Sequence, residues 1–322
     1  MMALYADALL PPGAVEHELV ASDGVRLRAA NWTPPRALGT VVLLGGRTEY
    51  IEKYSETIAD LLARDLAVAT LDWRGQGGSE RQLADRFKGH IDDFALYERD
   101  FVAFARDVLA DCPRPWIGLC HSMGGAIMLR IAHEGRCPFD RLVLSSPMVA
   151  LYGHAEPRWA RRLVEALDAL GLGGFYAPGG GGGKPYGLSP FEGNLLTSDP
   201  VRYAHFGETL RAHPALGLGA PTIGWLHAAF RLMREFAEPD YPRAIQTPIL
   251  VIASGADRVV DTRGVERFAS RLRAGSLIVI DGARHETMFE RDALRELFFK
   301  AFDAFALGAT TDEPAFTSPY RA

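Results

Sequence analysis

Short apolar runs alternate along the chain with longer segments in which apolar residues recur at helical spacing. The runs have strand length and are mostly rich in Val, Leu and Ile, which is typical of strands buried on both faces of a parallel sheet. They span residues 40–44, 67–71, 116–120, 141–145, 249–253 and 276–280. The helical segments span residues 54–64, 94–110, 123–134, 262–272 and 292–305. This order predicts a doubly wound α/β fold, with a mostly parallel central sheet and helices on both faces.

The start of the chain has a different pattern. Two alternating apolar and polar runs, 15–21 and 25–32, flank the turn sequence Ser22-Asp23-Gly24. A short turn between two such runs is typical of a hairpin. We therefore expect an antiparallel beginning to the sheet.

The strand pattern stops between about residues 147 and 245. A gap of this length is too long for a structureless loop in a compact domain. The sequence predicts an inserted helical cap over 147–245, which divides the core into 1–146 and 246–310 and leaves a tail over 311–322.

The cap contains an amphipathic segment over residues 157–171, with Trp159, Leu163, Leu167 and Leu170 near one stripe. Such a helix either packs on the core or rests at a lipid interface, and we favour packing. Several aromatic residues could line an acyl tunnel or form an ordinary cap core; they are Phe175, Tyr176, Tyr186, Phe191, Trp225, Phe230 and Phe236.

Composition and charge narrow the function classes. Of the 322 residues, 48% are hydrophobic and 23% are charged, as in a globular chain with a large core. The net charge of -5 supplies no broad positive field, which argues against nucleic acid as a partner. Three cysteines without CxxC spacing indicate neither a disulfide framework nor a zinc site. Oligomeric state is left open.

We expect a cytoplasmic location, with or without peripheral contact at the inner membrane face through the cap. No Lys or Arg precedes Arg26, so the first residues lack the positive region of a secretory signal. Residues 212–230 carry no charge and are long enough to span a bilayer. Their prolines, glycines and histidines favour a loop and a helix instead.

The clearest chemical signal follows the strand over 116–120, where His121-Ser122-Met123-Gly124-Gly125 leads into an apolar helix. A nucleophilic serine on a sharp strand-to-helix turn needs small neighbours two residues away on each side. Gly124 satisfies one side, while Cys120 replaces the glycine of the GxSxG pattern on the other. We predict that Ser122 is a nucleophile; the alternative is a simple helix cap.

A serine nucleophile needs an imidazole base oriented by a carboxylate. His285 follows the last predicted strand, and Asp257 follows the strand before it. Both lie at the sheet edge where active sites of open α/β sheets form. Asp261 is the rival acid, but it is better placed to cap the next helix, and Asp281 is too near His285 in sequence.

The oxyanion of such a reaction requires preorganised N–H donors. In this arrangement one donor belongs to the residue after the nucleophile, and the other belongs to the loop after the third strand, here residues 40–44. These are the backbone amides of Met123 and Arg47, the latter in the loop that begins Gly45-Gly46.

No cofactor or metal is implied by the sequence. The run Gly179 to Gly183 before Lys184 resembles a phosphate loop, but Pro178 and Pro185 occupy positions where that motif needs glycine and Ser or Thr. A flexible hinge is the better interpretation.

Together these residues resemble the monoacylglycerol lipases and bacterial lysophospholipases of the α/β-hydrolase superfamily. The motifs that carry the resemblance are Gly46-Arg47-Thr48-Glu49, residues 72–79, Gly89-His90-Ile91, residues 121–125, residues 256–261 and His285-Glu286; residues 194–199 of the cap are also similar. The resemblance implies a serine hydrolase that cleaves esters of single-chain lipids, lysophospholipid or monoacylglycerol, through an acyl-enzyme.

Other functions remain open at this point. The acyl substrate could be a small ester, thioester or amide, the acceptor could be an alcohol as in an acyltransferase, or the chain could be a non-catalytic lipid-binding protein on a hydrolase scaffold. An aspartate-nucleophile dehalogenase or epoxide hydrolase is disfavoured because the elbow carries serine.

Overall fold

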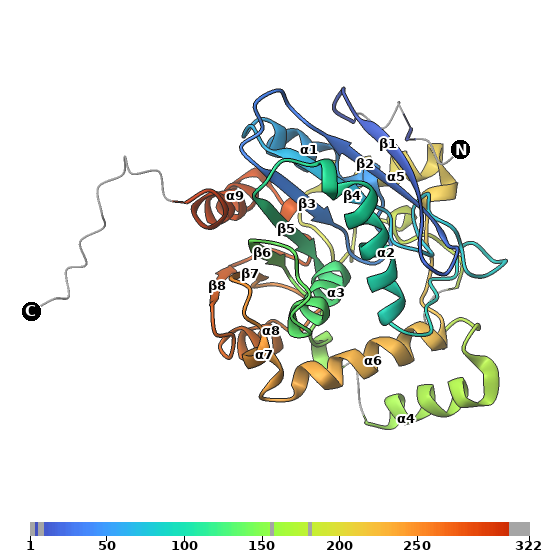
Figure 1. Ribbon diagram of the computed structural model, residues 1–322. Helices are drawn as coiled ribbons and strands as arrows, with labels where there is room; N and C mark the ends of the chain where they lie inside the picture. The colour runs from blue at the N-terminus through green and yellow to red at the C-terminus, as the bar shows by residue number, and fades with distance from the viewer. Residues whose placement is uncertain (1–3, 6–9, 155–157, 180–181, 309–322) are drawn as a thin grey trace, which may run out of the picture.

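The structure is a computed structural model that describes residues 4–5, 10–154, 158–179 and 182–308. One eight-stranded sheet forms its centre (Figure 1). The strands are β1 (Val15–Val20), β2 (Arg26–Trp32), β3 (Thr40–Leu44), β4 (Ala67–Leu71), β5 (Trp116–His121), β6 (Arg141–Ser145), β7 (Ile249–Ser254) and β8 (Gly275–Ile280). Their spatial order is β1-β2-β4-β3-β5-β6-β7-β8.

The pairing directions agree with the sequence. Strands β3 to β8 pair in parallel, while β1 and β2 pair antiparallel with each other and β2 pairs antiparallel with β4. The predicted α/β class, the mostly parallel sheet and the antiparallel start are therefore confirmed. The expectation that these strands are buried on both faces is wrong for β8, where Leu277, Ile278 and Val279 are about 40% exposed. This strand lies at the sheet edge and has a neighbour on one side only.

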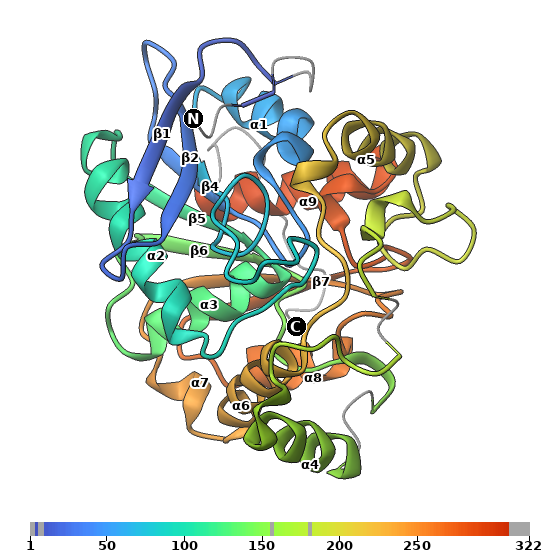
Figure 2. The same cartoon turned by 90° about the vertical axis from the view of Figure 1, so that its right-hand side faces the viewer.

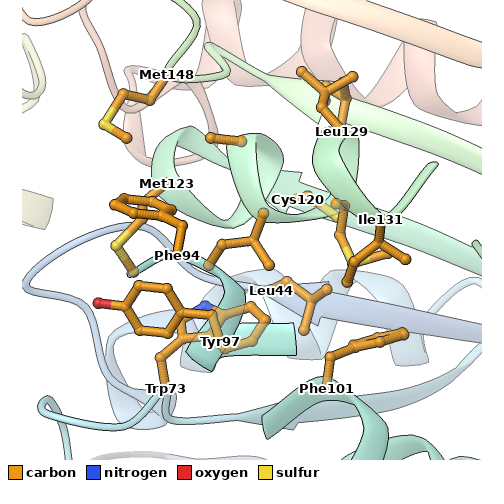
Figure 3. Packing of buried hydrophobic residues seen from close by; sticks show 14 of the residues in the cluster. Leu44, Trp73, Phe94, Tyr97, Phe101, Cys120, Met123, Leu129, Ile131 and Met148 are labelled. Atoms are coloured by element: carbon orange, nitrogen blue, oxygen red, sulfur yellow. The ribbon is translucent and has the colours of Figure 1, made fainter. Parts of the chain in front are cut away.

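Helices cover both faces of the sheet. Helices α1 (Ser55–Leu62) and α9 (Asp292–Ala306) pack on one face, where Ile58 and Phe298 join a buried cluster with the strands. Helices α2 (Ala95–Asp107), α3 (Ser122–His133) and α8 (Thr262–Ala269) pack on the other face. Figure 3 shows part of this second core, in which Leu44, Trp73 and Met123 lie together.

Helices fill the described part of the insertion between β6 and β7. They are α4 (Arg158–Leu167), α5 (Pro200–Ala212), α6 (Ile223–Ala237) and the short α7 (Tyr241–Ala244). Helices α4 and α6 lie side by side, whereas α5 lies apart from them (Figure 2) and reaches the first residue of α9 through Arg202. We keep the word cap for residues 147–245.

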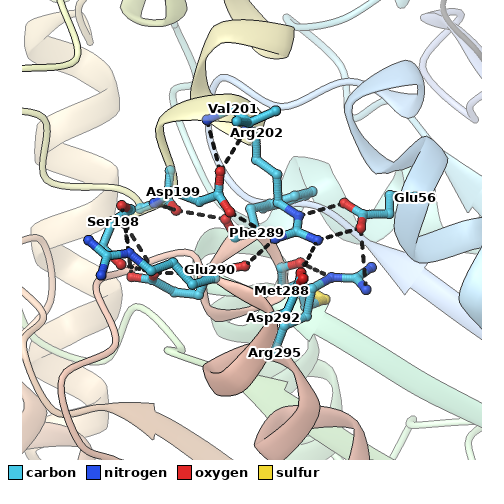
Figure 4. Close-up of polar contacts among 12 residues, drawn as sticks. Glu56, Ser198, Asp199, Val201, Arg202, Met288, Phe289, Glu290, Asp292 and Arg295 are labelled. Carbon is cyan, nitrogen blue, oxygen red and sulfur yellow. Dashed lines mark hydrogen bonds and ion pairs between the residues drawn. The ribbon is translucent and has the colours of Figure 1, made fainter.

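Helix α5 is fixed to the core by a polar network, shown in Figure 4. Arg202 bonds both carboxylate oxygens of Glu56 on α1, at 2.7 and 2.6 Å, and lies 2.7 Å from Asp292 on α9. Glu290 is fully buried and accepts hydrogen bonds from the backbone N–H groups of Ser198 at 3.1 Å and Arg284 at 2.8 Å. The second of these amides belongs to the residue before His285, so the network also anchors the loop that carries this histidine.

Helix α4 differs from the expectation that its apolar stripe packs on the core. Trp159, Leu163 and Leu170 are 69%, 45% and 75% exposed. Val164 and Leu167 form the edge that joins the core cluster beside α6. One neighbouring helix covers only one edge of the stripe, so the rest faces outward.

Some expectations fall outside the described residues. The tail over 311–322 and two glycines of the predicted hinge, at 180 and 181, belong to this group. Within the part of the chain that is described, no helix combines the length and apolar character needed to cross a bilayer.

Candidate active site

Ser122 lies on the sharp turn between β5 and α3, with a φ of 47°. This left-handed backbone is costly for a residue other than glycine and occurs where surrounding structure enforces it. Gly124 makes the turn possible, because a Cβ there would lie 2.5 Å from the carbonyl oxygen of Leu44. The N-cap position of α3 is held by His121, so the simple capping alternative for Ser122 does not describe this turn.

Cys120 fills the place of the first glycine in the elbow pattern without entering the cavity. Its side chain is fully buried in the apolar core between the sheet and α3 (Figure 3). Burial raises the pKa of the Cys120 thiol well above its ordinary value. The thiol is therefore a small packing group behind the serine.

The structure brings Ser122, His285 and Asp257 into one hydrogen-bonded line. His285 Nε2 lies 3.0 Å from Ser122 Oγ, and His285 Nδ1 lies 2.8 Å from Asp257 Oδ2. All three residues are buried. The carboxylate can only accept, so Nδ1 carries the imidazole proton and Nε2 is free to accept the serine proton.

Asp257 is held as an anion by its surroundings. Burial alone would raise the pKa of its carboxyl, but the charge and hydrogen bond of His285, with the amides of Val259 and Val260, bring that pKa below the ordinary value. The two other acids that the sequence offered lie elsewhere. Asp261 occupies the N-cap position of α8 without a side-chain capping bond, contrary to the expected capping role, and Asp281 is exposed.

The loop after β3 lies directly against the nucleophile. A Cβ on Gly46 would lie 3.1 Å from Ser122 Cβ, so the chain passes the serine as closely as a glycine allows. Arg47 follows in this loop, and Met123 is in the first turn of α3, where backbone N–H groups have no helical partner. Both predicted oxyanion donors therefore belong to segments that border the serine.

Residues beyond the sequence prediction hold this loop in place. Gln76 donates from Nε2 to the carbonyl oxygen of Gly46 at 2.7 Å and accepts from the Thr48 amide at 3.3 Å. Trp73 donates from Nε1 to the carbonyl oxygen of Gly45 at 3.0 Å. The sequence shows these side chains only as part of a tight turn, because contacts across the sheet leave no local pattern.

A second missed feature is a buried charged network behind the site, centred on Glu49. Its carboxylate accepts from the Gly46 amide, lies 3.0 Å from Lys53 Nζ and lies 3.2 Å from His121 Nδ1. Burial raises the pKa of Glu49, but the charges of Lys53 and His121 outweigh this effect and hold the pKa well below its ordinary value. His121 Nε2 lies 3.2 Å from the carbonyl oxygen of His285. Burial lowers the pKa of His121, but the charge and hydrogen bond of Glu49 outweigh it and raise that pKa above its ordinary value. With an acceptor at each ring nitrogen, His121 is a poorer base than His285.

A cavity of about 550 Å³ opens in front of Ser122. Its walls come from both the core and the cap; apolar lining residues include Met148, Leu151, Leu195, Leu196, Val259 and Val260. Of the aromatic residues considered for a tunnel, Tyr186 and Trp225 line this cavity. Phe230 and Phe236 belong to the buried core, and Phe175 is 60% exposed.

No group of three or more His, Cys, Asp or Glu side chains in the described ranges has the arrangement of a metal site. The arrangement at Ser122 has a nucleophile and a base with its orienting acid, and the two segments that carry the predicted oxyanion donors lie beside them, as acyl transfer requires.

Comparisons with known proteins agree with this geometry. The family model described as serine aminopeptidase, S33, matches residues 35–292. Lysophospholipase L2 of Escherichia coli K12 is 31% identical over 303 residues, which cover 90% of this chain and 86% of the relative. Monoglyceride lipase of Mus musculus is 30% identical over 277 residues, which cover 83% of this chain and 82% of the relative.

A solved structure extends the comparison to the fold. A soluble variant of monoglyceride lipase from Saccharomyces cerevisiae, in complex with a substrate analog, superposes with a TM-score of 0.71. Its sequence is 19% identical, and the match covers 89% of this chain and 94% of that chain. At this level of identity the likeness supports a shared α/β-hydrolase fold and nothing more.

Proposed function

The chain belongs to the serine aminopeptidase S33 family, among the lysophospholipases and monoacylglycerol lipases of the α/β-hydrolase superfamily, and we propose that it hydrolyses carboxylic esters of single-chain lipids. The observation that carries this proposal is the line from Asp257 through His285 to Ser122, with bonds of 2.8 and 3.0 Å at the wall of a largely apolar cavity. Lysophospholipid and monoacylglycerol are the two substrate classes we consider.

The first half of the reaction acylates the serine. His285 Nε2 takes the proton of Ser122 Oγ as that oxygen attacks the ester carbonyl, and Asp257 stabilises the imidazolium that forms. The amides of Arg47 and Met123 donate to the oxyanion of the tetrahedral intermediate. His285 then protonates the leaving alcohol oxygen, and the acyl group stays on Ser122.

The second half returns the enzyme to its starting state. Water enters the site of the departed alcohol, His285 removes its proton, and the resulting hydroxide attacks the acyl-serine carbonyl. Collapse of this second tetrahedral intermediate releases the fatty acid and restores the serine proton. An alcohol in place of water would give acyl transfer, which is the main alternative.

An ester substrate is favoured over a peptide with a free amino terminus. Binding such an amino group inside the site requires an available carboxylate. Glu49 and Glu286 border the cavity, and each has one oxygen bonded to the ammonium of Lys53, at 3.0 and 2.5 Å. The other oxygen of Glu286, Oε2, is buried and has no hydrogen-bond partner among the described residues, but the charge of both carboxylates is already engaged by Lys53. Glu192 also borders the cavity but is exposed to solvent.

We also propose that the outward stripe of α4 meets the lipid surface, on the cytoplasmic side of the membrane as the sequence leads us to expect. Trp159, Leu163 and Leu170 are exposed together, and Arg162 on the same helix is exposed as well. Apolar residues flanked by arginine are typical of helices that lie in a membrane interface.

Labelling with a fluorophosphonate, followed by peptide mass spectrometry, tests the proposed nucleophile. Wild type should be labelled at Ser122, and Ser122→Ala should lose the label together with about 10⁴-fold or more of its esterase activity. Ser146→Ala is a matched control, since Ser146 is also buried with a φ of 43° but bonds Ser254 instead of a histidine. Lipid binding without label or turnover in wild type would favour the non-catalytic alternative.

A further inference from the structure

Arg47 brings a positive charge to the wall of the substrate cavity. Its Nη2 donates a 2.6 Å hydrogen bond to the carbonyl oxygen of Gly219 in the cap, and its guanidinium carbon lies 5.2 Å from the centre of the Trp225 ring. Its Nε is buried and bonds no other described residue. A guanidinium has five N–H donors, so Arg47 keeps donors that the protein itself does not use.

Two fully buried arginines elsewhere in the core have acidic partners. Arg28 lies 2.6 Å from Glu52, and Arg74 lies 2.6 Å from Asp100. Burial lowers the pKa of both arginines, but their partners outweigh it and raise the pKa overall. Burial lowers the pKa of Arg47 to about 10, because no acidic side chain in the described ranges forms an ion pair with it. Arg47 is half-buried and stands at the cavity wall, where N–H donors that no described residue accepts are available to an anionic ligand.

The surroundings of Arg47 preserve this unpaired state. Glu49 and Glu286 border the same cavity but are bonded to Lys53, as described above. Gly89 gives the guanidinium room, because a Cβ there would collide with its Nη2. The cavity therefore joins the acyl-accepting serine to an uncompensated cation.

We propose that the Arg47 side chain binds the phosphodiester of a lysophospholipid head group while Ser122 attacks the acyl ester of the same molecule. This inference rests on the proposed function. Guanidinium and phosphate are matched in charge and in hydrogen-bond geometry, and in a lysophospholipid only the glycerol backbone separates the phosphate from the ester. A monoacylglycerol lacks the phosphate, so Arg47 sets the preference between the two substrate classes.

Kinetics on two esters with the same acyl chain test this assignment. Decanoyl lysophosphatidylcholine and decanoyl glycerol are compared as monomers, by the ratio of their kcat/KM values. Arg47→Gln should lower the ratio in favour of lysophospholipid about 10- to 100-fold, mainly through KM. Arg47→Lys keeps the charge and should lose less. Arg99→Gln, which removes an exposed arginine of α2 outside the cavity, should leave the ratio within about twofold.

The outcomes separate this inference from the function on which it rests. Equal losses on both esters in Arg47→Gln would overturn it and would assign the side chain to holding Gly219 of the cap. A wild type that cleaves decanoyl glycerol but not the lysophospholipid would also overturn it, while leaving the esterase intact. Cleavage of neither ester by wild type would instead contradict the proposed function.

A measurement on wild type alone covers the case in which a variant fails to fold. Glycerophosphocholine should inhibit decanoyl glycerol hydrolysis competitively and more strongly than glycerol does. Inhibition by glycerophosphocholine no stronger than that by glycerol would overturn the proposal.

Discussion

The outer helices of the cap, α4 and α5, are held to the molecule by different forces. Helix α5 is tied to α1 and α9 through Arg202 and rests on the buried carboxylate of Glu290. Helix α4 packs through one edge on α6 and leaves Trp159 and Leu163 exposed, with Leu170 exposed just beyond its end. Polar contacts with defined geometry fix position, whereas exposed apolar area supplies free energy for binding a surface. The difference suits α5 to positioning the His285 loop and suits α4 to the contact with lipid that we propose.

Removing the buried carboxylate should have the largest effect on this arrangement. Glu290→Ala leaves the amides of Ser198 and Arg284 buried without acceptors, and we expect the free energy of unfolding to fall by about 2–4 kcal/mol. Urea denaturation gives the value. Glu192→Ala removes an exposed carboxylate of the cap segment that precedes α5 and should change stability by less than about 0.5 kcal/mol. Equal stability of the two variants would remove the distinction between the helices.

Removing the exposed apolar side chains of α4 should have an intermediate effect, on binding to lipid vesicles rather than on the stability of the protein. Trp159→Ser combined with Leu163→Ser should weaken binding to phospholipid vesicles about tenfold, because about 1.4 kcal/mol of apolar transfer free energy is lost. Vesicle sedimentation measures this binding.

An apolar residue on the other helix provides the control. Val201 on α5 is 76% exposed, so Val201→Ser removes exposed apolar surface from a helix that we do not expect to touch lipid. Its vesicle binding should match wild type. If Val201→Ser weakens vesicle binding as much as the double variant of α4 does, the vesicle contact is spread over the cap and does not reside on α4.

The smallest effect should be the pH-dependent stability that the ion pair of Glu56 with Arg202 contributes to the α5 network. The hydrogen bond and charge of Arg202 outweigh burial and lower the pKa of Glu56 below its ordinary 4.5. A lowered carboxyl pKa adds stability above pH 4.5 that is lost as the pH falls through the folded-state pKa. The thermal midpoint of Glu56→Gln should therefore lie slightly below that of wild type at pH 7, and the gap should close below pH 4.5. A gap that widens on acidification would exclude this ion pair as its source.

Much of the fold was predictable from the sequence, because buried parallel strands leave continuous apolar runs such as residues 40–44 and 249–253. The orientation of α4 was not predictable in this way. Its stripe has the same helical spacing whether Trp159 meets a core or solvent, and only the position of α6 decides which edge is covered. The apolar pattern thus does not predict which side of a helix is covered when the covering element is distant in sequence.

The site shows the same division. Ser122, Asp257 and His285 each follow a strand, so their meeting at one sheet edge was expected from chain order. The contacts of Gln76 with the loop after β3 and the isolated charge of Arg47 depend on segments that meet across the fold. A motif indicates which groups react, while these contacts determine how the loop is held and what the cavity attracts.

The central claim, acyl transfer through Ser122, is tested most directly by trapping the intermediate. Wild type mixed with p-nitrophenyl decanoate and quenched within milliseconds should gain one decanoyl mass, and peptide mapping should locate it on Ser122. Turnover of this ester with decanoyl on a different residue, or with no acyl adduct at any quench time while Ser122→Ala remains active, would contradict the account.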